Sequence, residues 1–143
     1  LLFKSVKIEN LSMNPSRWRN FKMSDRHIIK LTDVKLITCV LQNGLAEDVL
    51  EAAKNVGVQG ATVSYARGTG IRDRMGLMGV VIDEQKEVIR IIVSEEQASR
   101  VFEAMHLAAG LDTPGKGIIY ISDLENVATY IPEDVLKSIE DES

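Results

Sequence analysis

Apolar residues recur with two different periods from Val34 onward, and these periods predict six main elements of secondary structure. Helical spacing is found in the segments 45–56 and 95–109, and a glycine at which a helix can end follows each of them. Ser94 and Gln97 form a capping-box pattern at the start of the second segment. Apolar runs or period-two alternation predict four strands, at 34–41, 61–65, 88–93 and 117–121. A short extended piece at 127–131 and a helical tail after Pro132 complete the pattern.

The order of these elements predicts the fold class. Strand, helix, strand, strand, helix, strand is the order of a ferredoxin-like α+β sandwich (βαββαβ), with a four-stranded antiparallel sheet and two helices on one face. In one copy of the chain, the other face of this sheet has no cover. Because symmetric homo-oligomers are the commonest assemblies, we expect other copies of the chain to cover it.

The connection between the second and third strands is long and rich in glycine. Gly68 to Gly79 contains four glycines, two methionines and three charged residues. Loops of this length are commonly functional. The apolar residues of this segment, which include Met75 and Met78, would suit a groove on a protein partner; the alternative is that they fold back onto the domain.

Charge divides the chain into regions. Residues 1–35 carry eight basic and three acidic residues, whereas residues 36–143 carry nine basic and 18 acidic residues. The net charge of the whole chain is −4. The basic segment could bind phosphate or an anionic lipid surface, but a leader without function has the same pattern. We therefore predict a basic leader at 1–34, disordered or foreign to the natural chain, a domain at 35–131 and an acidic tail at 132–143. The acidic domain argues against nucleic acid as its partner.

Composition excludes several classes of protein. The single cysteine, Cys39, excludes an internal disulfide framework and a multi-cysteine metal cage. No apolar run approaches the length of a membrane span, so we expect a cytoplasmic protein. His27 and His106 are the only histidines, and neither has a serine or cysteine nucleophile beside it in sequence. We therefore predict no metal site and no enzyme.

The segment Gly110–Gly117 (GLDTPGKG) is one residue short of the phosphate-binding pattern GxxxxGK[ST]. It follows a helix and opens a strand, whereas that pattern lies between a strand and the helix that it opens, so it is no ordinary nucleotide-hydrolase loop. A Gly-Lys-Gly turn can still direct backbone N–H groups and the Lys116 ammonium at an anion. A helix end followed by a turn would use the same glycines.

The stretch 55–70, NVGVQGATVSYARGTG, closely resembles the PII nitrogen regulatory signal-transduction family, in which a similar VGxxGxTVxxxxGxG segment enters a long exposed loop. The likeness runs from about Lys35 to Ile131 and includes the segments 88–96 and 115–121. This resemblance implies a ferredoxin-like homotrimer that binds adenine nucleotides in clefts between subunits. It also implies that the long loop meets a target enzyme, transporter or transcription factor.

By the same resemblance, the nucleotide cleft would use three short segments: Gly60, Ala61 and Thr62; Gly68, Thr69 and Gly70; and Gly115, Lys116 and Gly117. The first would come from one subunit, the second would form the base of the long loop, and the glycines of the third would give backbone contacts to phosphate.

Several departures from the family pattern bear on the ligand. Ile118 stands where the family has a lysine, which leaves Lys116 as a candidate, and Thr129 and Ile131 stand where the family usually has two arginines. Charge-assisted contacts contribute about 1.5–3 kcal/mol each, so the loss of two arginines would weaken the binding of a triphosphate. ADP, AMP or another small anion is therefore as plausible an effector as ATP. Between Arg72 and Val88 there is no tyrosine to accept a uridylyl group, so the partner should also differ.

These observations predict a cytoplasmic PII-like regulator that binds a small anionic effector and controls a partner protein, such as a nitrogen-metabolism enzyme or a membrane transporter. The first alternative is a trimeric protein of the divalent-cation tolerance type, which needs a stronger metal-binding set than His27, His106 and Cys39. The second is an enzyme that uses the uncovered sheet face.

Overall fold

The computed structural model describes residues 6–9, 28–68, 84–135 and 137. The chain divides into two compact units, one formed by residues 35–123 and one by residues 1–34 together with 124–143. No helix in the described part of the chain is long and apolar enough to cross a membrane.

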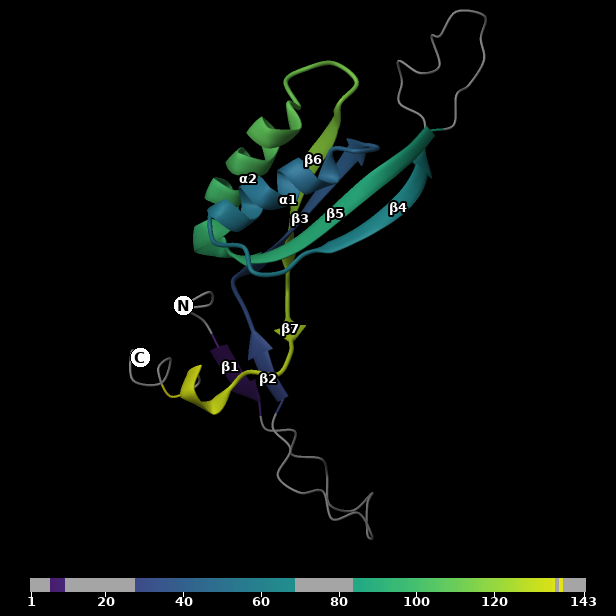
Figure 1. Ribbon diagram of the computed structural model, residues 1–143. Helices are drawn as coiled ribbons and strands as arrows, with labels where there is room; N and C mark the ends of the chain where they lie inside the picture. Colours follow the sequence, from purple (N-terminus) through teal and green to yellow (C-terminus); the bar gives the residue numbers. More distant parts are fainter. Residues whose placement is uncertain (1–5, 10–27, 69–83, 136, 138–143) are drawn as a thin grey trace, which may run out of the picture. The chain divides into compact units, whose positions relative to one another are not determined.

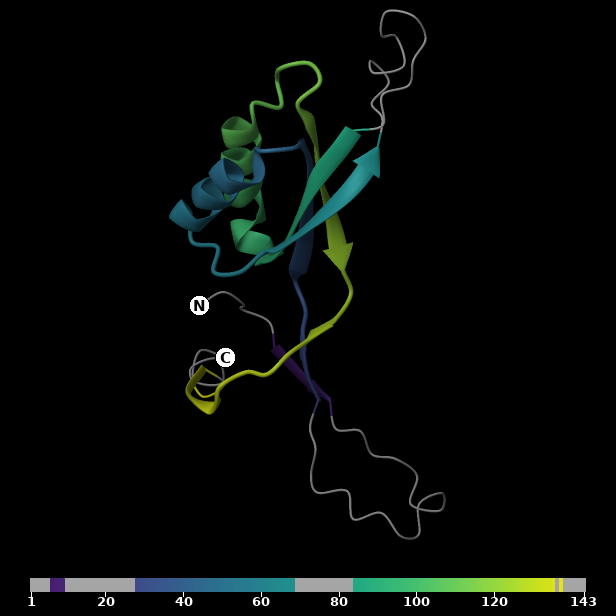
Figure 2. The ribbon, with the colours of Figure 1, turned by 45° about the vertical axis from the view of Figure 1, so that its right-hand side comes forward.

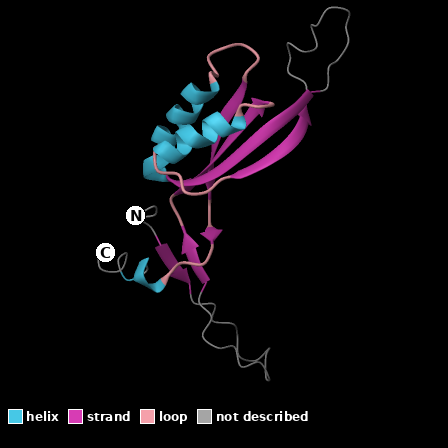
Figure 3. Ribbon diagram, in the orientation of Figure 1, coloured by secondary structure: helices cyan, strands magenta, loops and turns pink. Residues whose placement is uncertain are grey.

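The larger unit has the predicted ferredoxin-like fold. Its four strands lie side by side in the order β4-β5-β3-β6, and both helices pack on one face of this sheet (Figure 1 and Figure 3). The elements are β3 (Val34–Gln42), α1 (Ala46–Asn55), β4 (Thr62–Gly68), β5 (Glu84–Ser94), α2 (Glu95–Ala109) and β6 (Gly117–Leu124). The prediction of fold class is therefore confirmed.

The core lies between the helices and one face of the sheet. Alternate residues of β3 and β5 are buried in it, together with one stripe of each helix: Ile37, Cys39, Leu41, Ile89, Ile91, Val93, Ala46, Val49, Ala53, Ala98, Val101, Met105 and Ala109. The residues between them project from the other face, which has no helix on it (Figure 2). Three apolar side chains there are widely exposed: Ile92 (48%), Ile118 (58%) and Tyr120 (46%).

Strand β5 begins four residues earlier than the hydrophobic pattern predicts. Residues 84–87 are polar or charged, but they pair with the second half of β4 in an antiparallel register that joins Gly68 to Glu84 and Thr62 to Arg90. Pairing with a neighbouring strand satisfies the backbone of these residues without an apolar pattern. The rest of the predicted long connection, residues 69–83, lies outside the described residues.

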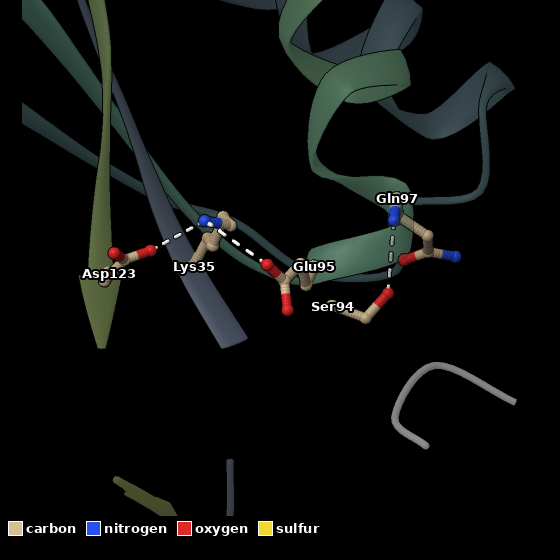
Figure 4. Close-up of polar contacts among 5 residues, drawn as sticks. All are labelled: Lys35, Ser94, Glu95, Gln97 and Asp123. Atoms are coloured by element: carbon tan, nitrogen blue, oxygen red, sulfur yellow. Dashed lines mark hydrogen bonds and ion pairs between the residues drawn. The ribbon is translucent and has the colours of Figure 1, made fainter. Parts of the chain in front are cut away.

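Helix α2 has the ends that its sequence predicts. Ser94 is the N-cap residue, and its Oγ accepts a hydrogen bond of 3.3 Å from the Gln97 backbone N–H (Figure 4). Gly110 ends the helix in the left-handed conformation, with φ at +61°.

The smaller unit contains a three-stranded sheet in the order β1-β2-β7, formed by β1 (Val6–Glu9), β2 (Ile28–Leu31) and β7 (Val127–Ala128). Two of these strands lie in the segment 1–34, for which the charge pattern predicts a leader that is disordered or foreign to the natural chain. Residues 124–131 belong to the unit of the N-terminal strands, and the predicted domain bounds, 35–131, stay a prediction. Pairing of β2 with β7, Lys30 with Ala128 and Leu31 with Val127, joins segments almost 100 residues apart, which local patterns do not reveal.

Helix α1 takes its N-terminal cap from β5. Leu45, at the N-cap position, has no side chain that can accept a hydrogen bond. The backbone N–H of Ala46 instead donates to Glu87 Oε2 at 2.8 Å, and Glu87 is 8% exposed. A carboxylate at a helix N-terminus also interacts favourably with the helix dipole. Glu87 therefore fixes the start of α1 to the middle of the sheet.

Strand β6 approaches β3 closely at Gly117. The backbone N–H of Gln42 donates to the Lys116 carbonyl at 3.2 Å, and Gly117 has a φ of +148°. A Cβ at position 117 would overlap the Val40 carbonyl oxygen and lie 3.2 Å from Leu41 Cα. Only glycine fits this position without a backbone shift.

Gly117→Ala should lower the free energy of unfolding by at least about 2 kcal/mol, because it adds both a steric overlap and a strained φ. Gly60→Ala is the matched control, since Gly60 has no positive φ and no atom within 4 Å of an added Cβ. Urea denaturation followed by circular dichroism measures both variants. Equal stability of the two would contradict the close approach.

Glu87→Ala should destabilise the domain by about 1–3 kcal/mol, because it leaves the Ala46 N–H without its acceptor. Glu103→Ala removes an exposed carboxylate from α2 and should change stability by less than about 0.5 kcal/mol. The same denaturation experiment compares them, and a Glu87 variant as stable as the Glu103 variant would rule out the cap.

Candidate functional site

The glycine-rich segments that the sequence singles out lie in two parts of the larger unit. Gly60, Ala61 and Thr62 lead into β4, while the segment 115–117 leads into β6. The start of β6 and the paired ends of β4 and β5 lie at one end of the sheet, and the connection from α1 to β4 lies at the other (Figure 1 and Figure 2). Gly68 ends β4, and Thr69 and Gly70 lie outside the described residues.

One copy of the chain therefore does not bring these segments together. Strands β4 and β6 are the two edges of the sheet, with β5 and β3 between them. Gly68 and Gly117 consequently lie on opposite edges, although they share an end of the sheet. A single site that uses all three segments requires contributions from more than one copy. The site residues stay a prediction.

The turn before β6 is held by Gln42, a residue that the sequence did not single out. The Gln42 side-chain amide donates to the Gly115 carbonyl at 2.8 Å, in addition to the backbone bond from Gln42 to Lys116. Gly115 has a φ of +81° and no atom within 4 Å of an added Cβ, and Lys116 is exposed. The turn is thus anchored through its carbonyl oxygens and presents one ammonium group to solvent.

A hollow of about 560 Å³ adjoins the other candidate segment. Gly60 and Ala61 line it, together with two residues of α1 and three that follow the helix: Leu50, Lys54, Gly57, Val58 and Gln59. The side chain of Lys54 places a positive charge beside this hollow. The sequence did not single out Lys54, because a lysine in the last turn of an amphipathic helix is common. Lys54 is the one charged residue among those that line this hollow.

Arg90 is the second cation near this segment. It lies on β5 directly opposite Thr62, and its Nη1 donates to Ser64 Oγ at 3.2 Å. Sequence reasoning did not select Arg90, because 28 residues separate it from Thr62 and only the strand register brings the two together.

A further hollow, of about 540 Å³, surrounds Lys35. The Lys35 ammonium donates to Asp123 Oδ1 at 2.6 Å and lies 3.9 Å from Glu95 Oε1 (Figure 4). The hydrogen bond to Asp123 raises the pKa of Lys35, against a smaller effect of desolvation. Because two carboxylates already neutralise it, Lys35 is a poor binding group for a further anion.

Cys39 lies in the core, where burial raises the pKa of its thiol to about 11. At neutral pH this thiol is protonated, which agrees with its interpretation as a small apolar core residue. Among the described residues, no three His, Cys, Asp or Glu side chains are grouped closely enough to hold a metal ion.

Comparisons with known proteins place the chain in a family. The family model for nitrogen regulatory protein P-II matches residues 34–133. The nitrogen regulatory protein P-II of Rhizobium meliloti (strain 1021) is 31% identical over 99 residues, which are 66% of this chain and 88% of that protein. The nitrogen regulatory protein GlnK of Escherichia coli (strain K12) is 28% identical over 99 residues, with the same two shares.

Among solved structures, a crystal structure of Arabidopsis thaliana PII bound to citrate matches with a TM-score of 0.54 and 20% identity. The match covers 66% of this chain and 79% of that chain, and it shows a common fold. The range that the family model matches includes the three glycine-containing segments. The chain belongs to the nitrogen regulatory protein P-II family.

Proposed function

We propose that this protein is a PII-type signal-transduction regulator that binds a small anionic effector, most simply an adenine nucleotide, between the subunits of a homotrimer. Through the segment between β4 and β5, the bound protein controls a partner protein, such as a nitrogen-metabolism enzyme or a membrane transporter. The observation that carries the proposal is the family match over residues 34–133.

The uncovered face of the sheet supports assembly with other copies. Ile92 lies in an inner strand, where neighbours on both sides normally bury such a residue, yet it is 48% exposed. Together with Ile118 and Tyr120 it forms an apolar surface, which water disfavours and which copies of the chain would cover. The helices already occupy the other face, so association through this face leaves the core unchanged.

The positions of the glycine-rich segments support a ligand site between subunits. Segments 60–62 and 115–117 lie at opposite ends of the sheet, so a neighbouring copy is needed to bring one against the other. The turn at Gly115 has a backbone conformation that leaves space for a ligand, since nothing lies within 4 Å of an added Cβ there. Lys116 and Lys54 supply positive charge for an anion.

The assembly is tested by light scattering on the purified chain, with the mass of three copies expected. Ile92→Glu places a charge on the uncovered sheet face and should shift the mass toward one copy. Leu107→Glu is the control, because Leu107 is 77% exposed on α2, on the helix side of the sheet. A wild-type monomer, or a trimeric Ile92 variant, would contradict association through this face.

The effector is tested by calorimetric titration with ATP, ADP and AMP. Gly115→Asp should weaken binding at least about tenfold, because its carboxylate repels an anion, whereas Gly115→Asn should change it far less. The two side chains have the same size and both tolerate a positive φ, so the comparison isolates charge. Absence of nucleotide binding by the wild-type protein would exclude adenine nucleotides as the effector.

A further inference from the structure

The strand register places one arginine beside the candidate segment 60–62. Arg90 on β5 pairs with Thr62 on β4, at the point where β4 leaves the α1–β4 connection. Its guanidinium reaches along β4 to Ser64 Oγ, at 3.2 Å. The alternation of both strands puts Thr62, Ser64 and Arg90 on the face that the helices leave uncovered, because Ile89 and Ile91 belong to the core face.

The charge of Arg90 is not balanced within this part of the structure. An arginine stays protonated at physiological pH, and the polar partner of Arg90 within the described ranges is the neutral hydroxyl of Ser64. Lys35 differs in this respect, since Asp123 and Glu95 flank its ammonium group. A guanidinium has five N–H donors, so the contact with Ser64 leaves a planar pair of donors for another group.

The surroundings of Arg90 make an anionic partner favourable. Val88 and Ile92 flank it on the same face, at 6% and 48% exposure. If copies of the chain cover this face, as proposed above, they withdraw the guanidinium from water. A charge removed from water is costly unless a group of opposite charge and hydrogen-bonding capacity meets it.

We infer that Arg90 binds an anionic oxygen pair of the effector, from a phosphate or a carboxylate, at the side of the cleft formed by segment 60–62. This inference rests on the proposed function and specifies how the site works. Thr129 and Ile131 carry no charge, and Arg90 supplies a cation in their place. Ser64 is a positioning residue, because its hydroxyl holds the guanidinium along β4.

The test compares Arg90→Gln, Arg90→Lys and the wild-type protein by calorimetric titration with ADP, citrate and uncharged adenosine. Lys137→Gln is the control for the loss of one positive charge, since Lys137 is exposed and lies in the other unit. We expect Arg90→Gln to weaken binding of the anionic ligand about tenfold to a hundredfold. Arg90→Lys should recover part of this loss, because it restores the charge without the planar fork, and adenosine should bind all variants equally.

The two anionic ligands show whether Arg90 binds a phosphate or a carboxylate. A loss for ADP assigns Arg90 to a phosphate, and a loss for citrate assigns it to a carboxylate. Light scattering and thermal unfolding accompany each titration, so that a loss of assembly or folding is recognised. Arg90→Lys preserves the charge and provides the measurement if Arg90→Gln does not assemble.

Three results would overturn the inference. If the wild-type protein binds ADP or citrate and both Arg90 variants bind it equally well, the proposed function stands and Arg90 is not part of the site. If both variants lose the trimer while the Lys137 variant keeps it, Arg90 pairs with a neighbouring copy instead of the effector. If the wild-type protein binds neither anion, the proposed effector class fails and the role of Arg90 fails with it.

Discussion

The packing of both helices on one face of the sheet is the constraint on which the rest of this structure depends. It produces a complete core from α1, α2 and the inner side of β3 and β5, and it leaves apolar residues of β5 and β6 exposed to water on the outer side of the sheet. A sheet covered on one side only is stable as a layer, but its exposed face favours association. The exposed apolar surface and the proposed assembly both follow from this arrangement.

The local patterns of the sequence predicted the larger unit well, because its elements have strong local signals. In α2, the Ser94 cap, the apolar stripe and Gly110 all mark the same helix, and the structure confirms each of them. Strand β5 was predicted too short because residues 84–87 have no apolar alternation, and long-range pairing with β4 determines their conformation. For the same reason β1 and β2, whose pairing reaches β7 at the far end of the chain, were not predicted.

The candidate site was only partly accessible from the sequence. Glycines in short motifs are visible directly, and the structure gives a physical reason for Gly117 in its contact with the β3 backbone. Gln42 and Arg90 were not visible, since each acts on a segment distant in sequence: Gln42 on the turn before β6, and Arg90 beside the start of β4. The residues around Gln42 and Arg90 in sequence form no motif that marks a site. The strand register, which no local pattern specifies, determines where these two side chains lie.

Glu87 couples the alignment of β5 to the position of α1. If β5 slipped along β4 by two residues, Gln85 or Ile89 would come to the first amide of α1, and a slip of one would turn Glu87 to the opposite face. The two anchor points of the connecting segment, Gly68 and Glu84, are therefore held at a fixed separation. Insertions or deletions between them would alter the reach of that segment and leave its anchors in place. The length of that segment can thus differ among related proteins while the domain itself stays the same.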